Sequence, residues 1–460
     1  MFKVNGILRG AAISLAVAGL GVAQTSPVTI EQAVEQAAKN YPAIRASMST
    51  VTAAESGIEL AKTAYLPRTD FHYQVNRATR NNIFGLTFPN TVIAPISGPP
   101  VVDQAGTSTF GTAVGLAFRW EPFDLGLRKS LVDLANRVRA QAAAGQDLTE
   151  YEVKLAAADA FFNVLAATQA ATAARANVQR MEVFTESVGA LVRAELRPGA
   201  DSSRAQAELA RARNELIGAE RVVHEQRLLL GRWMGRAGTE IEISAGALLM
   251  DPPVVEDREP NLATHPVAAA QAANIYVIRA RRESIAKEYR PKFELLSTTY
   301  GRATGARNDG TFQGGANGLA PNIGNWAVGF GVSFPLFDYK QNRVRREIES
   351  HRETAEGARL DEILERLKSE AAQAQVSLEA ARQIASNTPT QLTAAQTLER
   401  QAQARYQTGL GTVVEVADGQ RLLRQAETDG ALAKLGIWRA LFTLQAAKGD
   451  LAGVLAQGSR

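Results

Sequence analysis

Two carboxylates in the second half of the chain have a spacing suited to binding cations. Glu415 and Asp418 are three residues apart, so on a helix they lie on one face. They follow the turn Gly409-Leu410-Gly411-Thr412, in which glycine ends one helix and Thr412 can cap the next. Two interpretations stay open. The acids either complement the positive end of a helix dipole, or form a cation-selective constriction where several copies meet around a pore.

A similar turn occurs in the first half of the chain. Pro198 and Gly199 break a helical pattern near residues 197–203, and Asp201 or Ser202 can cap the helix that follows. Both turns are therefore predicted to be the tips of helical hairpins.

Residues that usually carry enzymatic or metal chemistry are absent or scattered. The chain has no cysteine, which excludes disulfides, thiolate metal sites and a cysteine nucleophile. No two histidines have metal-ligand spacing, so each is expected to be an ordinary surface or strand residue: His72, His224, His265 and His351. No phosphate-binding loop, nucleophile elbow or zinc-protease motif occurs. We therefore expect no enzyme activity, cofactor or resident metal. The missing motifs also argue against an exported hydrolase.

The N-terminus predicts export. Residues 1–23 contain Lys3 and Arg9, an apolar run over 10–22, and a small-residue ending that favours cleavage after Ala23. The run of 13 residues is too short to span a membrane as a helix. Loss of the two basic residues lowers the formal net charge from +4 to +2, which gives no argument for nucleic-acid binding.

The chain is internally duplicated. Residues 114–235 match residues 328–449 at a constant offset of 214 positions. We therefore expect a first repeat over 24–258 and a second over 259–449, each with a helix, two strands and a long helical hairpin. The first tip lies near 197–203 and the second near 408–415. Residues 450–460 are expected to form a flexible C-terminal tail, because the helical pattern fades there and glycines appear.

The long helices carry a coiled-coil pattern. An unbroken helical pattern runs over residues 124–197, and Leu209, Leu216, Val223 and Leu230 follow at intervals of seven. At 1.5 Å per residue the first of these stretches would extend roughly 100 Å. Aromatics make up only 6% of the residues, so an ordinary globular core is not expected.

Four segments alternate apolar and small or polar residues, as strands with two different faces do. They are centred on Phe71–Val75, Phe110–Trp120, Lys292–Tyr300 and Trp326–Phe334. Such alternation is typical of membrane-spanning strands, although a soluble half-buried sheet would show it too. Four strands cannot close a barrel, and open sheet edges are not tolerated in lipid. Several chains must therefore contribute strands to a single barrel. Three chains would give twelve strands, and Glu415 with Asp418 would then form a ring of six carboxylates.

This arrangement resembles the TolC-type outer-membrane efflux proteins over nearly the whole mature chain. The residues that carry the resemblance are Thr29-Ile30-Glu31-Gln32-Ala33, Asn40-Tyr41-Pro42, Ala64-Tyr65-Leu66-Pro67, Phe334-Pro335-Leu336-Phe337-Asp338 and Arg405-Tyr406-Gln407-Thr408-Gly409. The fold class it implies is an α+β membrane protein. By this resemblance, three chains would form a 12-stranded β-barrel in the outer membrane, continued by a long α-helical coiled-coil barrel through the periplasm.

The resemblance also implies a function and partners. The chain would be the passive exit duct of a tripartite efflux or type I secretion system, working with a periplasmic adaptor and an inner-membrane pump. Drugs, metal ions and polypeptides remain open as cargo. The alternative is a periplasmic coiled-coil scaffold or adaptor without membrane strands.

Finally, the resemblance implies a gate. Family members carry two acids at the positions of Glu415 and Asp418, which favours the constriction over the helix-dipole interpretation. Their closed state is latched by a tyrosine and an arginine of the second tip, bonded to an aspartate of the first. Tyr406 and Asp201 match two of these residues, but Gly411 stands where the arginine would be. Arg405 or Arg204 would have to replace it, so we expect a looser latch.

Overall fold

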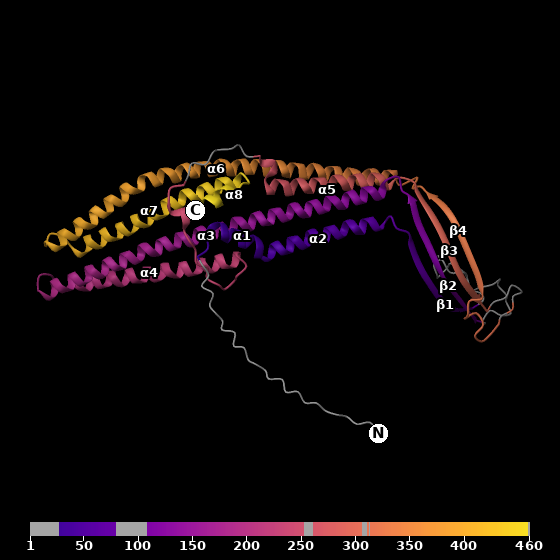
Figure 1. Ribbon diagram of the computed structural model, residues 1–460, viewed down its shortest axis with the longest axis horizontal. Coiled ribbons are helices and arrows are strands. Elements are labelled where there is room, and N and C mark those ends of the chain that lie inside the picture. Colours follow the sequence, from indigo (N-terminus) through magenta and orange to yellow (C-terminus); the bar gives the residue numbers. More distant parts are fainter. Residues whose placement is uncertain (1–26, 80–107, 253–260, 306–310, 312, 459–460) are drawn as a thin grey trace, which may run out of the picture.

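The computed structural model describes residues 27–79, 108–252, 261–305, 311 and 313–458 of the chain. The predicted signal peptide and the loop over 81–106 lie outside these residues. The molecule is long and narrow, with four strands at one end and the tips of two helical hairpins at the other (Figure 1).

The N-terminal part of each repeat is a helix that ends at a strand. Thr29 caps α1 (Ile30–Asn40) in a reciprocal pair of bonds with Gln32. Pro42 then starts α2 (Pro42–Thr63), so α1 and α2 are separate helices. In the second repeat Pro266 starts α5 (Pro266–Glu288) in the same way.

The four strands form one antiparallel sheet in the order β1-β2-β3-β4. Their bounds are β1 Arg68–Thr79, β2 Ser108–Phe123, β3 Lys292–Thr304 and β4 Ile323–Ser333. All four predicted strands are therefore present. Because β1 and β4 each pair on one side within this sheet, each leaves one edge open.

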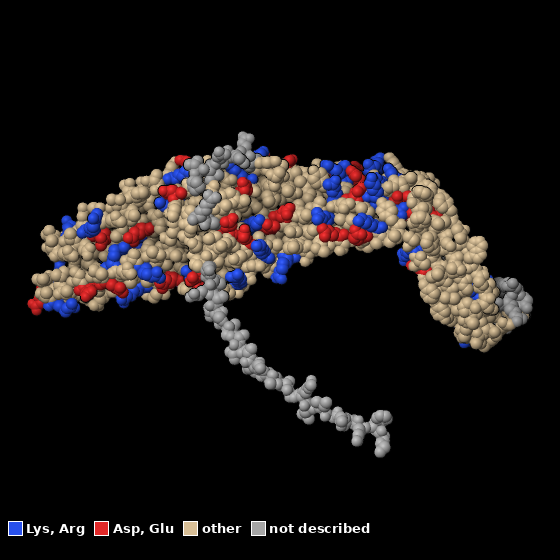
Figure 2. Space-filling model, in the orientation of Figure 1, with Lys and Arg blue, Asp and Glu red and all other residues tan. Residues whose placement is uncertain are grey.

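The register gives the sheet two chemically different faces. Phe71 pairs with Leu116, Leu116 with Thr299, and Thr299 with Trp326, so these side chains share a face. Large apolar side chains on this face are exposed, with Trp326 79% and Phe71 68% accessible. The opposite face carries mostly small and polar side chains, among them Gly115, Ala117 and Thr298, together with Tyr300 and Leu296. Figure 2 shows that the sheet end carries far fewer charged side chains than the helical part.

One glycine is needed for this register. Gly115 lies directly opposite Tyr300. A Cβ atom on Gly115 would come within 2.4 Å of the Tyr300 Cβ atom, which no side chain can do. The register therefore requires glycine at this position.

Two long helical hairpins occupy the other end. Helix α3 (Leu127–Arg193) returns as α4 (Gly199–Trp233), and α6 (Tyr339–Gln407) returns as α7 (Val413–Ala447). Among the heptad residues predicted to pack, Val223 and Leu230 are buried, and Leu209 and Leu216 are partly buried against the hairpin core. No helix in the described part of the chain is long and apolar enough to cross a membrane.

The main hydrophobic core lies midway along the helices. It joins α1, α3 and α7 through side chains that include Phe161, Phe162 and Trp438, and the Trp438 Nε1 atom donates to the Met250 carbonyl oxygen at 2.9 Å. Short 3-10 turns, η2 (Gly246–Leu249) and η3 (Leu262–Thr264), connect the two repeats.

The expectation of a flexible tail over 450–460 was wrong for most of these residues. Residues Ala452–Gly458 form helix α8, and Val454 and Leu455 are buried in the main core. Gly458 packs against Leu248 and Ile30, and a Cβ atom there would lie 2.9 Å from the Leu248 Cδ2 atom. The helical pattern in the sequence fades because this helix is short and alanine- and glycine-rich, yet its apolar side chains still find a core.

Candidate gate at the hairpin tips

The first tip is the loop between α3 and α4, residues 194–198. Glu195 adopts a left-handed conformation with φ of 62°, which reverses the chain, and Pro198 precedes the first turn of α4. The prediction that Asp201 or Ser202 caps α4 was wrong, because Pro198 occupies the cap position and α4 has no side-chain cap bond. Asp201 instead lies inside the first turn, and its carboxylate is free to bond elsewhere.

The second tip is the loop between α6 and α7, residues 408–412. Gly409 has φ of 86°, and the Gly411 nitrogen donates to the Arg405 carbonyl oxygen at 3.0 Å. Thr412 caps α7 by accepting a bond from the Glu415 nitrogen at 3.3 Å, as predicted. A Cβ atom on Gly411 would lie only 3.0 Å from the Tyr406 nitrogen and 3.1 Å from the Arg405 Cβ. The turn is therefore tight at this position, and a larger residue at 411 would require the end of α6 to shift by a few tenths of an ångström.

Tyr406 joins the two tips. Its hydroxyl donates to the Asp201 Oδ2 atom at 3.1 Å, its ring contacts Phe184 edge-on at 5.4 Å, and its side chain is 1% exposed. Burial, and secondly the negative charge of Asp201, raise the pKa of Tyr406 to about 12. The hydroxyl therefore stays protonated and keeps donating at physiological pH.

An arginine of the first tip also contacts Tyr406. The Arg197 Nη2 atom donates to the Tyr406 carbonyl oxygen, and its Cζ atom lies 4.4 Å from the Tyr406 ring centroid. Arg405 and Arg204, which were expected to fill the role of the latch arginine, make other contacts in the structure. Arg405 stays within its own hairpin, where it donates to the Leu410 carbonyl oxygen at 3.1 Å and faces Glu415. Arg204 lines a pocket farther along the helices.

Glu415 and Asp418 lie on the exposed side of α7, and each faces an arginine of its own hairpin. Glu415 is 3.6 Å from the Arg405 Nε atom, and Asp418 is 3.4 Å from the Arg421 Nη2 atom. Glu415 belongs to the first turn of α7, where the helix dipole favours an acid. Asp418 lies beyond that turn, so the dipole does not account for it. Its charged partner in the described structure is Arg421, three residues further along the same helix.

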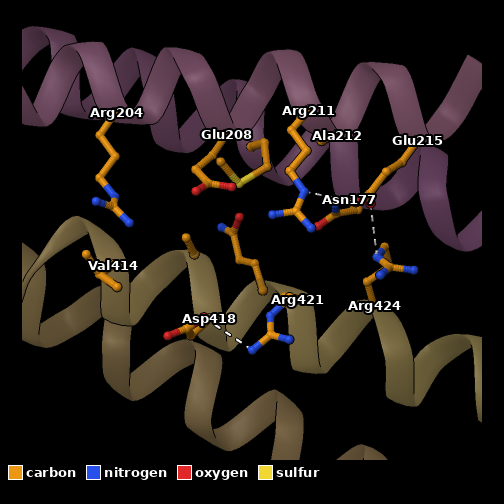
Figure 3. Close-up of a pocket in the computed structure, with 13 residues that line it drawn as sticks. Asn177, Arg204, Glu208, Arg211, Ala212, Glu215, Val414, Asp418, Arg421 and Arg424 are labelled. Atoms are coloured by element: carbon orange, nitrogen blue, oxygen red, sulfur yellow. Dashed lines mark hydrogen bonds and ion pairs between the residues drawn. The ribbon is translucent and has the colours of Figure 1, made fainter.

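Between the hairpins, behind the tips, lies a polar pocket (Figure 3). Arg204, Glu208, Arg211 and Glu215 project from α4 toward Asp418, Arg421 and Arg424 on α7. Gln420 and Asn177 are buried in its wall, and their side-chain oxygens have no hydrogen-bond partner among the described residues. The hairpins thus meet here through charged and polar groups.

The sequence did not point to Arg197 or to the Arg180–Glu427 pair that joins α3 to α7. Arg197 immediately precedes Pro198, so a systematic inspection of the tip for cations could have found it. Arg180 and Glu427 are 247 positions apart and carry no local pattern. Only the relative placement of the two hairpins brings them together.

The histidines have different environments. His224 is exposed and bonds to Glu240, but the expectation of an ordinary surface or strand residue was wrong for His265. It is 2% exposed, its Nδ1 atom accepts from the Val267 nitrogen to cap α5, and its Nε2 atom lies 3.2 Å from the Ala446 carbonyl oxygen. Burial lowers its pKa. The described residues contain no group of three or more histidine, aspartate or glutamate side chains placed to hold a metal ion.

Comparison with known proteins identifies the family. The model of the outer membrane efflux protein family matches residues 33–236 and 261–450, which are the two repeats. The chain belongs to this family, and it is located in the outer membrane and extends into the periplasm. No match was found among curated protein sequences.

Several solved structures share the fold. The CmeC outer membrane channel of Campylobacter jejuni is similar over 100% of this chain and 98% of its own, at 12% identity and a TM-score of 0.71. VceC of Vibrio cholerae is similar over 91% of this chain and 96% of its own, at 16% identity and a TM-score of 0.70. The MtrE outer membrane channel of Neisseria gonorrhoeae was solved in an open state. It is similar over 92% of this chain and 89% of its own, at 18% identity and a TM-score of 0.69. At these identities the likeness shows the fold, which confirms the predicted class of helical chain with four strands and an internal repeat.

Proposed function

We propose that three copies of this chain form a passive exit duct from the periplasm through the outer membrane. The observation that carries the proposal is the sheet, which has two open edges and one broadly exposed apolar face. Backbone groups at an open edge are costly in lipid, and pairing β4 of one copy with β1 of the next would satisfy them. Three sheets of four strands would close a barrel wide enough to leave a lumen.

The helices would continue this barrel as a tube. Helix α3 alone has 67 residues, a length of roughly 100 Å. The hairpin tips would reach the periplasmic end, where a periplasmic adaptor and an inner-membrane pump would supply cargo and energy. In this assembly residues 1–23 are the cleaved signal peptide, and 24–258 and 259–449 are the two structural repeats.

The tips would form the gate. Tyr406, Asp201 and Arg197 would hold the hairpins together at rest. Glu415 and Asp418, repeated in three copies, would make an acidic ring that favours cations. Pro198, Gly199, Gly409 and Gly411 would shape the turns that place these groups.

Conductance in planar lipid bilayers tests this function. Purified protein should insert and give discrete, cation-preferring channels. The rival scaffold without membrane strands would give no channels, and carbonate would release it from membranes. The four long strands and the family membership argue against that rival.

A further inference from the structure

The second repeat carries an excess of positive charge where its helices meet the sheet. Residues 279–292, through the end of α5, and 339–352, at the start of α6, together hold eleven lysine and arginine residues against four acidic residues, a formal net charge of +7. Figure 2 shows blue side chains gathered over the part of α5 and α6 that adjoins the sheet. We call residues 279–292 and 339–352 the basic collar.

The first repeat lacks this excess. Aligned on Pro67 and Pro291, and on the offset of 214 positions after the strands, the matching residues are 55–68 and 125–138. They hold five lysine and arginine residues against three acidic residues, a formal net charge of +2. One of these five cations, Arg128, is buried in an ion pair within its own repeat. The charge of the basic collar is therefore a property of the second repeat and not of the fold.

Three cations in the first two turns of α6 have no partner of their own. Lys340, Arg343 and Arg346 are exposed, and within the described part of the chain their side chains make no ion pair or hydrogen bond. Glu347 lies one turn beyond Arg343, but these two side chains form no ion pair among the described residues. The three cations are thus available to an external anion.

The arginines lie on the side of α6 that continues the apolar face of the sheet. Phe334 directly follows β4 and continues the alternation of large apolar side chains on that face. Its ring contacts Tyr289 at 5.2 Å, and Tyr289 contacts Tyr339 at 5.9 Å, measured between ring centroids. Arg343 and Arg346 follow Tyr339 at intervals of four and three residues, so they share its helix face. In the proposed barrel this side of the sheet would contact lipid.

The distance from the sheet suits an electrostatic contact with a membrane surface. Strand β4 ends at Ser333 and α6 begins at Tyr339. At 1.5 Å per residue, Arg343 and Arg346 lie roughly 6 and 10 Å along the helix from its first residue. These lengths are within about one Debye length at physiological ionic strength. Cations this close to a membrane are attracted to acidic lipid headgroups.

The turn between β4 and α6 adds an apolar contact. Leu336 and Phe337 are 66% and 95% exposed. Exposed apolar side chains beside cations are typical of segments that lie at a membrane interface. In the first repeat, Phe123 stands at the position of Phe337 and is exposed as well. The aromatic residue is therefore common to both repeats, whereas the excess charge, which can select between lipids, belongs to the second alone.

We propose that the basic collar binds anionic phospholipid headgroups at the periplasmic surface of the outer membrane, chiefly through Arg343 and Arg346. This inference rests on the proposed function, because it takes the sheet to be embedded in lipid. The collar lies on the helical side of the sheet, which is the periplasmic side because the helices extend into the periplasm. Charge complementarity favours phosphatidylglycerol, which carries a net negative charge, over a zwitterionic phospholipid. Three chains would repeat the contact around the barrel.

Spin-labelled lipids measure this preference directly. The full-length mature protein is reconstituted in phosphatidylcholine vesicles that contain a trace of spin-labelled phosphatidylglycerol or of spin-labelled phosphatidylcholine. Electron paramagnetic resonance then gives the fraction of each probe that is immobilised at the protein surface. We expect phosphatidylglycerol to associate about twofold or more in excess of phosphatidylcholine at low salt. The ratio should fall toward one in about 1 M salt, where the Debye length is about 3 Å.

Two double variants locate the contact. Arg343→Gln with Arg346→Gln should bring the ratio close to one at low salt. Arg366→Gln with Arg382→Gln is the matched control, because it removes the same charge from exposed positions of α6 that lie at least roughly 30 Å farther from the sheet. This control should keep the wild-type ratio. Arg343→Lys with Arg346→Lys should keep it too, because the positive charge carries the contact.

The lipid contact is wrong if the wild-type protein shows no preference, if Arg343→Gln with Arg346→Gln leaves the ratio unchanged, or if the control pair lowers it as much. A preference that persists in high salt would also contradict it. Conductance in neutral phosphatidylcholine bilayers separates this result from failure of the proposed function, since all variants should form channels of wild-type conductance there. Channels without lipid preference contradict the basic collar alone, whereas absence of any channel contradicts the duct.

Discussion

The guanidinium of Arg197 lies over the ring of Tyr406, 4.4 Å from its centroid, and donates to the carbonyl oxygen of the same residue. The two residues belong to different hairpins, so this contact and the bond from Tyr406 to Asp201 close the tips together. In the proposed gate, Arg197 of the opposite tip would supply the cation that position 411 lacks.

Removing Arg197 should therefore open the gate more than removing the Tyr406 hydroxyl. Arg197→Ala loses a charge-assisted hydrogen bond and a cation–π contact, whereas Tyr406→Phe loses one hydrogen bond to a carboxylate, worth about 1.5–3 kcal/mol. We expect Arg197→Ala to raise the open fraction in bilayer recordings at least about tenfold, which corresponds to roughly 1.4 kcal/mol. Arg193→Ala, an exposed arginine at the end of α3, is the control. Equal effects of Arg193→Ala and Arg197→Ala would remove Arg197 from the latch.

The acidic pair should control ion selectivity. Glu415→Ala with Asp418→Ala should reduce cation preference and abolish block by multivalent cations, because the ring of carboxylates is lost. Asp429→Ala, farther along α7, removes a like charge and should leave selectivity unchanged. If the double variant keeps full cation preference in reversal-potential measurements, the two acids serve only their own helix and the constriction lies elsewhere.

The sequence predicted most of the fold because the patterns that specify it are local or repeated. Heptads gave the hairpins, alternation gave the four strands, and the offset of 214 gave the two repeats. It failed where the contact is distant or where few residues are involved. Arg197 reaches Tyr406 across 209 positions, His265 is buried by the second repeat, and α8 is a seven-residue helix held by tertiary packing.

His265 should make stability depend on pH. Burial lowers its pKa in the folded protein below the usual 6.5, against an opposing influence of the Ala446 carbonyl oxygen and Glu370. The folded state thus disfavours the proton, so stability is full above about pH 6.5 and falls as the pH drops from there toward the folded pKa, by at most about 1.4 kcal/mol per pH unit.

His265→Asn keeps a capping acceptor for α5 and should flatten this dependence in thermal unfolding between pH 7 and 5. His224→Asn, at an exposed site, should retain it. A wild-type protein whose stability is constant over this range would show that His265 is not protonated on unfolding.

Helix α8 should contribute to stability. Leu455→Ala removes a side chain from the main core and should cost roughly 2 kcal/mol or more of the free energy of unfolding. Ala456→Ser, on the exposed side of the same helix, should change it by less than about 0.5 kcal/mol. Equal thermal stability of the two variants would mean that α8 does not pack in solution.

The number of chains in the membrane-extracted protein tests the central claim most directly. A sheet with two open edges must be completed by other copies, and three copies give a closed barrel of twelve strands. Native mass spectrometry in mild detergent should therefore give the mass of three mature chains. A stable, folded monomer in the same detergent, with no trimer present, would contradict the shared barrel and with it the duct.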